Sequence, residues 1–266
     1  MNANLDIANV TIAGHRHPIV LRTYQPTNHR DLPVVLLFHG GGFTAGGLDH
    51  ADAAGRFIAS EMPARVVSVA YSLAPKFPFP AATEDAYAAL CWARQDVCRH
   101  GARPTRTAAV GHEAGGNIAA GLAAIARDRG NGLHAHALLA PWLDPSMTRL
   151  QMQREALPAD SEASACARAY RAYLPDVTQR LHPYAAPLES TRFATLPATS
   201  ISTAEQDLAR ADGETYASRL LVAGVPVEIT RYSGVAASDL LTDSRALNDI
   251  VAFLRKHLSS RAVAAR

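Results

Sequence analysis

Two patterns of apolar and polar positions follow each other in turn along most of the chain. Short runs rich in apolar residues are typical of strands buried in a sheet. We expect such strands at 34–38, 65–70, 106–110, 135–139, 199–202 and 227–232. Apolar residues spaced three and four positions apart predict helices. These occur at 52–60, 83–99, 118–126, 212–223 and 244–258.

The order of these segments predicts the class of fold. Strands that alternate with helices favour a mostly parallel sheet covered by helices on both faces. A short hairpin is expected before them, formed by 10–12 and 19–24 with Gly14 in its turn. We therefore predict an α/β fold, of the α/β-hydrolase type for reasons given below.

One segment interrupts the alternation. Residues 143–188 are polar with helical stretches, and in α/β enzymes such an insertion often covers the site. The prediction is one domain over 1–266 with a small helical cap at about 143–188. Large apolar residues near or within it suit either a pocket lining or packing of the cap, and both interpretations stay open. They are Trp142, Leu143, Tyr170 and Tyr173.

Composition limits the classes of partner. The net charge is only +2 over 266 residues, so there is no electrostatic case for nucleic acid or an anionic membrane. No apolar run reaches the roughly 20 residues of a membrane span, and the N-terminus lacks the regions of a signal peptide. The three cysteines show no metal-ligand spacing. We expect a cytoplasmic protein without a cofactor or a metal ion.

Three motifs carry most of the chemical information. They are His39-Gly40-Gly41-Gly42-Phe43, Tyr71-Ser72-Leu73-Ala74-Pro75 with the proline-rich 77–82, and Gly111-His112-Glu113-Ala114-Gly115-Gly116-Asn117. In this order and spacing the chain resembles the hormone-sensitive-lipase-like branch of the α/β-hydrolases. The resemblance runs from about residue 9 to residue 258. It implies the α/β-hydrolase fold and the site of a serine esterase.

Two positions depart from the family pattern. Glu113 stands where the G-x-S-x-G motif has its nucleophilic serine, and Ala237 stands where the resemblance places the histidine of the triad. Asp207 matches the position of the triad acid. A serine esterase needs both the hydroxyl and the histidine that takes its proton. We therefore expect a degenerate triad without ordinary acyl-enzyme hydrolysis.

The resemblance also assigns the surroundings of Glu113. It gives the oxyanion-hole donors as the backbone amides of Gly40, Gly41 and Ala114. It gives supporting roles to His39, Tyr71 and Asn117. Such a hole favours negative charge, so the Glu113 carboxylate is expected to fold into it. His112, which replaces the family's aspartate, is expected to point away from the pocket.

Several functions remain open. The favoured one is binding of a small apolar or carbonyl-containing ligand in the former active site, as a receptor, sensor or partner-binding protein; the gibberellin receptor of plants offers the analogy. A lyase or isomerase with Glu113 as general base is one alternative. A carboxylic-ester hydrolase with unorthodox or residual activity is another, including a nucleophilic Glu113 by analogy with dehalogenases. Relatives that dimerise through the sheet edge or the last helix make a homodimer possible.

Overall fold

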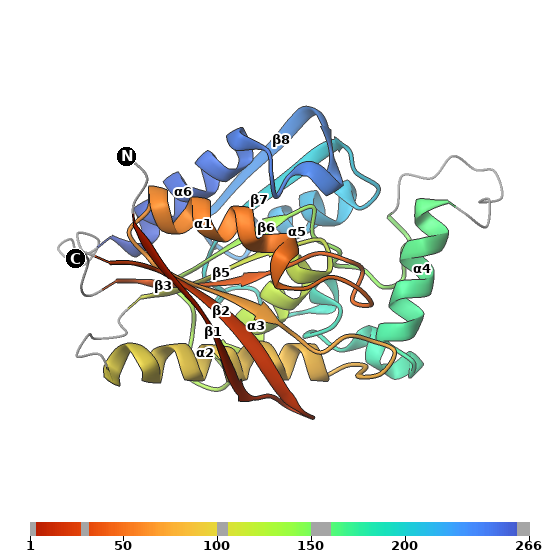
Figure 1. Ribbon diagram of the computed structural model, residues 1–266. Helices are drawn as coiled ribbons and strands as arrows, with labels where there is room; N and C mark the ends of the chain where they lie inside the picture. The colour runs from red at the N-terminus through yellow and green to blue at the C-terminus, as the bar shows by residue number, and fades with distance from the viewer. Residues whose placement is uncertain (1–3, 28–31, 100–105, 150–160, 260–266) are drawn as a thin grey trace.

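An eight-stranded sheet runs through the centre of the protein, as Figure 1 shows for the computed structural model. The structure describes residues 4–27, 32–99, 106–149 and 161–259. The strands are β1 (Leu5–Ala13), β2 (Pro18–Pro26), β3 (Val34–Phe38), β4 (Arg65–Ala70), β5 (Thr107–His112), β6 (Ala135–Leu139), β7 (Ala198–Gln206) and β8 (Val227–Ala236). Their order is β1-β2-β4-β3-β5-β6-β7-β8. Only β2 runs antiparallel to its neighbours.

The β3 strand shows why an unbroken apolar run forms the middle of this sheet. Successive side chains of a strand point to opposite faces. Val34, Leu36 and Phe38 accordingly pack in one core cluster. Val35 and Leu37 pack in the other. All five residues are buried, so a polar residue at any of them would lie in one of the two cores.

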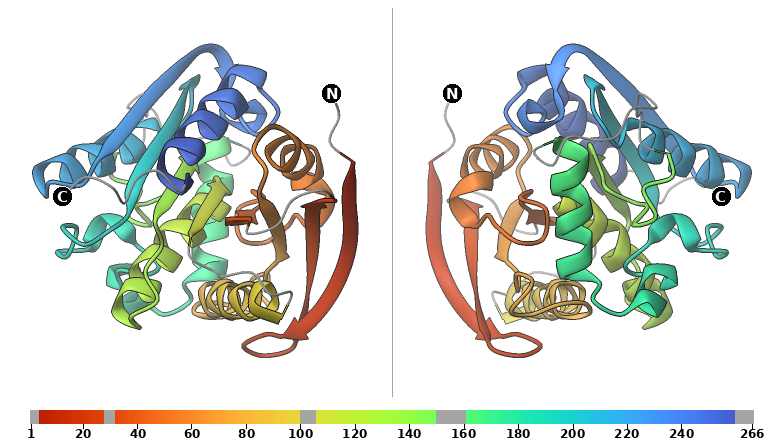
Figure 2. Two further views of the ribbon diagram at one scale, coloured as in Figure 1. Left: turned by 90° about the vertical axis from the view of Figure 1, so that its left-hand side faces the viewer. Right: turned by 90° about the vertical axis from the view of Figure 1, so that its right-hand side faces the viewer.

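Helices cover both faces of the sheet, as the two views in Figure 2 show. α1 (Asp52–Glu61) and α6 (Ser244–Leu258) contact each other and share one core cluster. α2 (Ala81–Arg99), α3 (Ala114–Asp128) and α5 (Arg210–Val222) contribute to the cluster on the other face. This arrangement confirms the predicted α/β fold with a mostly parallel sheet.

The structure extends several predicted elements toward the site. β5 continues to His112 and α3 begins at Ala114, so only Glu113 separates the strand from the helix. β8 continues to Ala236 and is followed directly by the short 3-10 helix η4 (Ala237–Asp239). The positions singled out by the motifs therefore lie at the carboxyl ends of strands, where ligands bind in α/β sheets.

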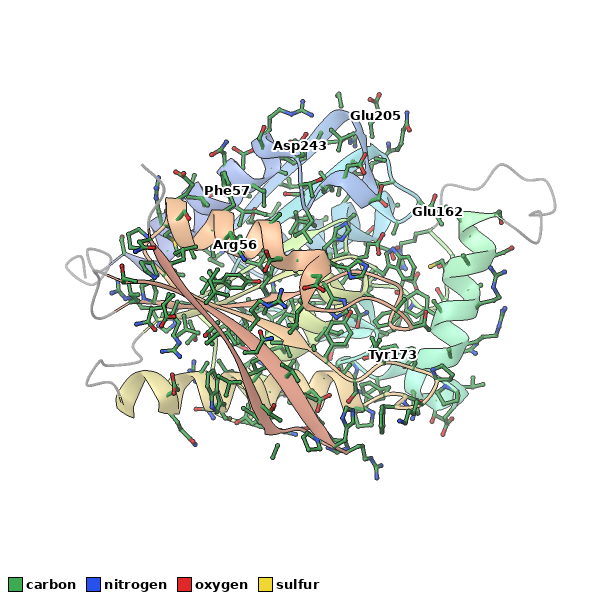
Figure 3. All side chains as sticks on the ribbon, viewed as in Figure 1. Arg56, Phe57, Glu162, Tyr173, Glu205 and Asp243 are labelled. Atoms are coloured by element: carbon green, nitrogen blue, oxygen red, sulfur yellow. The ribbon has the colours of Figure 1, made fainter. Side chains whose placement is uncertain are left out.

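The region between β6 and β7 contains α4 (Glu162–Tyr173) and two 3-10 helices, η2 (Val177–Leu181) and η3 (Pro187–Glu189). Residues 150–160 of the predicted insertion lie outside the described residues. Figure 3 labels the two ends of α4 and shows this helix beside the sheet rather than in either helical layer.

Aromatic side chains attach α4 to the loop that follows β3. Phe43 stacks on Tyr173 with ring centroids 4.0 Å apart and packs at 5.5 Å from Tyr170 and 6.2 Å from Trp142. Leu143 is fully buried in the same core. Of the two interpretations of these residues, the contacts favour packing of the inserted helix against the domain.

None of the helices in the described part of the chain combines the length and apolar character of a membrane span.

Candidate functional site

Glu113 lies on a sharp turn between β5 and α3. Its backbone has φ 50° and ψ −115°, a combination that residues other than glycine rarely adopt. Such a turn needs small neighbours, because a side chain at Gly111 would collide with the carbonyl of Gly115. The Glu113 amide donates to Leu139 O at 2.9 Å, and Asn117 N donates to Glu113 O at 3.1 Å. These contacts hold the Glu113 side chain above the carboxyl end of the sheet.

The Glu113 carboxylate faces the glycine loop that follows β3. Gly41 N donates to Glu113 Oε2 over 3.0 Å. Gly41 has a φ of 110°, which favours glycine, and this conformation turns its amide toward the carboxylate. In the described contacts, Gly41 is the donor to this carboxylate, whereas the amides of Gly40 and Ala114 are not. One of the three amides assigned by the resemblance therefore meets Glu113.

His39 and Tyr71 lie beneath the glycine loop. The His39 ring stacks on Tyr71 with centroids 4.2 Å apart, and its Nδ1 donates to Gly40 O at 2.7 Å. The Tyr71 hydroxyl donates to His39 O at 2.8 Å. Burial lowers the pKa of His39 to about 4, so its ring is neutral at physiological pH. These contacts support the loop and leave His39 outside the chemistry of the site.

Asn117 joins α3 to two other segments. Its Nδ2 donates to Trp142 O at 2.7 Å and to Ala185 O at 2.9 Å. Both acceptors belong to the region between β6 and β7. Asn117 thus connects the first turn of α3 to the segments that precede and follow α4.

The sheet brings the positions of the triad acid and the triad histidine together. Gln206 of β7 pairs with Ala236 of β8, and Asp207 and Ala237 are the next residues along each strand. Ala237 is buried, and its methyl group offers no proton acceptor. The register therefore brings Asp207 next to Ala237, the positions to which the resemblance assigns the triad acid and the triad histidine.

Asp207 is buried without a full set of partners. Its Oδ1 accepts a hydrogen bond from Ala209 N at 2.8 Å, while Oδ2 has no partner among the described residues. Burial raises the pKa of Asp207 to about 6, and the nearby charges of Glu162 and Glu113 act in the same direction. A buried carboxyl group with an unpartnered oxygen is costly to ionise.

His112 contradicts the sequence-based expectation that it points away from the pocket. The ring lies beside the Glu113 carboxylate: a Cβ at Gly40 would be 2.7 Å from His112 Nδ1 and 2.8 Å from Glu113 Oε2. The other ring nitrogen, Nε2, is 2.8 Å from Ala237 O. The carbonyl of Ala237 draws the ring inward, so His112 lines the site.

A cavity of about 210 Å3 opens beside these groups. Its lining residues are Gly40, Gly41, His50, His112, Glu113, Ser238, Leu241 and Thr242. The motifs did not reveal four of these: His50 precedes α1, and Ser238, Leu241 and Thr242 follow the lost histidine position. A search restricted to the turn after 237 would have found the last three. Leu241 is the one large apolar side chain in this lining, yet most of the exposed lining surface is apolar.

Cys166 of α4 lies close enough to this site for the charge of Glu113 to affect the pKa of its thiol. Burial raises the pKa of the Cys166 thiol to about 12, with further contributions from Asp212, Glu162 and Glu113. The thiol is therefore protonated at physiological pH and is not an alternative nucleophile. Within the described residues, no three His, Cys, Asp or Glu side chains are grouped so that they can hold a metal ion.

Comparison with known proteins agrees with this geometry. A family model for the alpha/beta hydrolase fold matches residues 35–237. The chain belongs to the α/β-hydrolase family. It is 38% identical over 219 residues to carboxylesterase NlhH of Mycobacterium tuberculosis, covering 80% of this chain and 68% of that protein.

Other relatives support the same branch of the family. Esterase LipI of Mycobacterium tuberculosis is 38% identical over 238 residues, which cover 86% of this chain and 73% of LipI. The structure of an esterase from Pyrobaculum calidifontis superposes with a TM-score of 0.85 at 33% identity, covering 94% of this chain and 85% of the esterase. The relatives named here are all esterases, and they support the resemblance to the hormone-sensitive-lipase-like branch.

Proposed function

We propose that this α/β-hydrolase binds a small ligand in the cavity beside Glu113 and does not hydrolyse esters through an acyl-enzyme. The observation that carries the proposal is the hydrogen bond from Gly41 N to Glu113 Oε2. A carboxylate in that place takes the donor that an ester oxyanion would need. In the unaltered protein Gly41 N is then occupied, and positions 113 and 237 hold neither serine nor histidine.

The cavity supports a binding role. Its volume of about 210 Å3 suits a compound of only a few carbon atoms. The mainly apolar surface of the lining supports the small apolar or carbonyl-containing ligand expected from the sequence. Its position at the carboxyl ends of the strands is that of ligand sites in other α/β proteins.

Hydrolysis of carboxylic esters is the second candidate. The esterase names of the relatives favour it. The chain itself offers one base for such a reaction, His112 Nδ1, which lies in the same cavity as Glu113. In this mechanism water would attack the ester carbonyl while His112 takes its proton, and the bond to the alcohol oxygen would break as His112 returns that proton to it. Glu113 would have to release Gly41 N to the developing oxyanion.

Hydrolysis of p-nitrophenyl acetate and butyrate separates the two candidates. We expect the unaltered protein to show the same rate as Glu113→Gln, in which the carboxylate is replaced by an amide of equal size. The double variant Glu113→Ser/Ala237→His should gain activity, since the β7–β8 register brings position 237 beside Asp207. Glu113→Ser alone is the matched control, because it has the nucleophile without the base.

One result would overturn the proposal in favour of hydrolysis. It is turnover by the unaltered protein that exceeds the uncatalysed rate by about tenfold or more, equivalent to about 1.4 kcal/mol in the barrier. Loss of that turnover in His112→Ala would then assign the base.

A further inference from the structure

The hydroxyl groups that line the cavity have already donated their protons. Ser238 Oγ donates to Asp239 Oδ1 at 3.0 Å. Thr242 Oγ1 donates to the backbone carbonyl of Asp239, also at 3.0 Å. A hydroxyl has one proton and two lone pairs. Both side chains therefore offer a ligand lone pairs alone.

The His112 ring is also an acceptor toward the cavity. Ala237 O is a carbonyl and can only accept, so the His112 Nε2 that contacts it carries the proton. Nδ1 is then the ring nitrogen without a hydrogen-bond partner among the described residues. This atom and Glu113 Oε2 both lie close to Gly40, since a Cβ there would be 2.7 Å from the first and 2.8 Å from the second, and all three residues line the cavity.

Glu113 adds negative charge to these acceptors. Its Oε2 accepts one hydrogen bond from Gly41 N, and its Oε1 has no protein donor among the described residues. Neither lysine nor arginine is among the residues that line the cavity. The carboxylate of Asp239 lies behind Ser238 and adds a second negative charge near the rim. A carboxylate that enters the cavity would thus meet charge of its own sign at Glu113.

We infer that the cavity binds the ammonium group of a small primary amine. This inference rests on the proposed binding function and names the class of ligand for the same site. An ammonium group brings three donors and a positive charge, which match the carboxylate of Glu113, Nδ1 of His112 and the hydroxyl oxygens. Leu241 gives a short alkyl chain an apolar contact. The replacement at 113 has thereby changed a site that favours anions into one that favours cations.

Calorimetric titration with three probes of equal chain length tests the inference: n-butylammonium chloride, butan-1-ol and sodium butyrate. We expect n-butylammonium to bind about tenfold or more tightly than butan-1-ol, and butyrate not to bind. Glu113→Gln should weaken n-butylammonium binding by about tenfold or more, because it removes the charge and keeps the size. Glu228→Gln is the matched control, since Glu228 is an exposed carboxylate on β8 that pairs with Lys256 away from the cavity.

A second variant keeps the test valid if Glu113→Gln folds poorly. Thr242→Val removes an acceptor at an exposed position, and we expect it to weaken n-butylammonium binding several-fold without changing thermal unfolding. Two results would overturn the inference. One is butyrate binding as tightly as n-butylammonium or more tightly, and the other is an n-butylammonium affinity that is unchanged in both variants. Such a failure leaves the proposed function standing, since only ester turnover by the unaltered protein contradicts that.

Discussion

His112 donates a hydrogen bond from Nε2 to the backbone carbonyl of Ala237 over 2.8 Å, although the two residues are 125 positions apart. The contact joins the end of β5 to the turn after β8. It depends on a backbone atom, so it does not require any particular side chain at 237. The turn that contains Ala237 is consequently held against the elbow at Glu113.

Gly40→Ala should displace the Glu113 carboxylate. The added methyl would lie within 2.8 Å of both Glu113 Oε2 and His112 Nδ1, closer than ordinary contacts allow. We expect a loss of about 1–3 kcal/mol in the free energy of unfolding, measured by chemical denaturation, and a crystal structure should show Glu113 away from Gly41 N. Gly47→Ala is the control, because nothing lies within 4 Å of its Cβ. An unchanged Glu113 in the Gly40→Ala structure would contradict this account.

Asp207→Asn should stabilise the protein at neutral pH and not at pH 4. Burial raises the folded-state pKa of Asp207 to about 6, above the usual 3.8, so the folded protein holds the proton more tightly than the unfolded chain. Stability then falls as the pH rises from about 4 to 6, by up to about 3 kcal/mol. Asparagine cannot ionise and should remove this loss. Denaturation curves at pH 4 and pH 7 measure it, and an equal effect at both would argue against it.

Two aspartates that share Arg22 should differ in their importance. Arg22 Nη1 is 2.8 Å from Asp49 and 3.0 Å from Asp52, but the Asp49 side chain is 90% exposed and that of Asp52 only 25%. Asp52 also accepts from the Tyr24 hydroxyl and pairs with Arg56. We expect Asp52→Ala to cost about 1–3 kcal/mol and Asp49→Ala less than about 1 kcal/mol. Urea denaturation of both variants would reveal a reversed order if the exposed pair mattered more.

Tyr173 should be important for the docking of α4 through its ring rather than its hydroxyl. The ring stacks on Phe43 at 4.0 Å, and the hydroxyl lies 3.2 Å from Thr83 Oγ1. Tyr173→Ala should cost about 3–5 kcal/mol by leaving a cavity. Tyr173→Phe keeps the stack and should cost about 1 kcal/mol. Thermal unfolding of the two variants distinguishes them, and similar losses would assign the effect to the hydrogen bond.

Features that depend on local sequence could be predicted for this protein, whereas features that depend on long-range contacts could not. Buried strands such as β3 were predictable because their apolar content is a local property. The direction of His112 was half predictable: in β5 it has the parity of Val110, which packs on the face covered by α1 and α6. That Ala237 lies on the same face is a long-range fact, set by how β8 ends. No local pattern contains it.

The identities of the cavity-lining groups show the same limit. Glu113 and the glycine loop were found because their motifs specify both residue types and spacing. Ser238 and Thr242 belong to the turn after β8, where many polar residues suit the backbone equally well. Their role emerges only when the sheet places that turn beside the elbow.

The strained turn at Glu113 has a practical consequence for engineering. Its φ of 50° is imposed by Gly111, Gly115 and the backbone hydrogen bonds around it rather than by the glutamate. Any residue introduced at 113 therefore takes the same backbone position and side-chain direction, because the surrounding backbone already fixes them. Saturation mutagenesis at this single codon, with histidine restored at 237 as a parallel background, would screen alternative chemistries on a scaffold that needs no redesign.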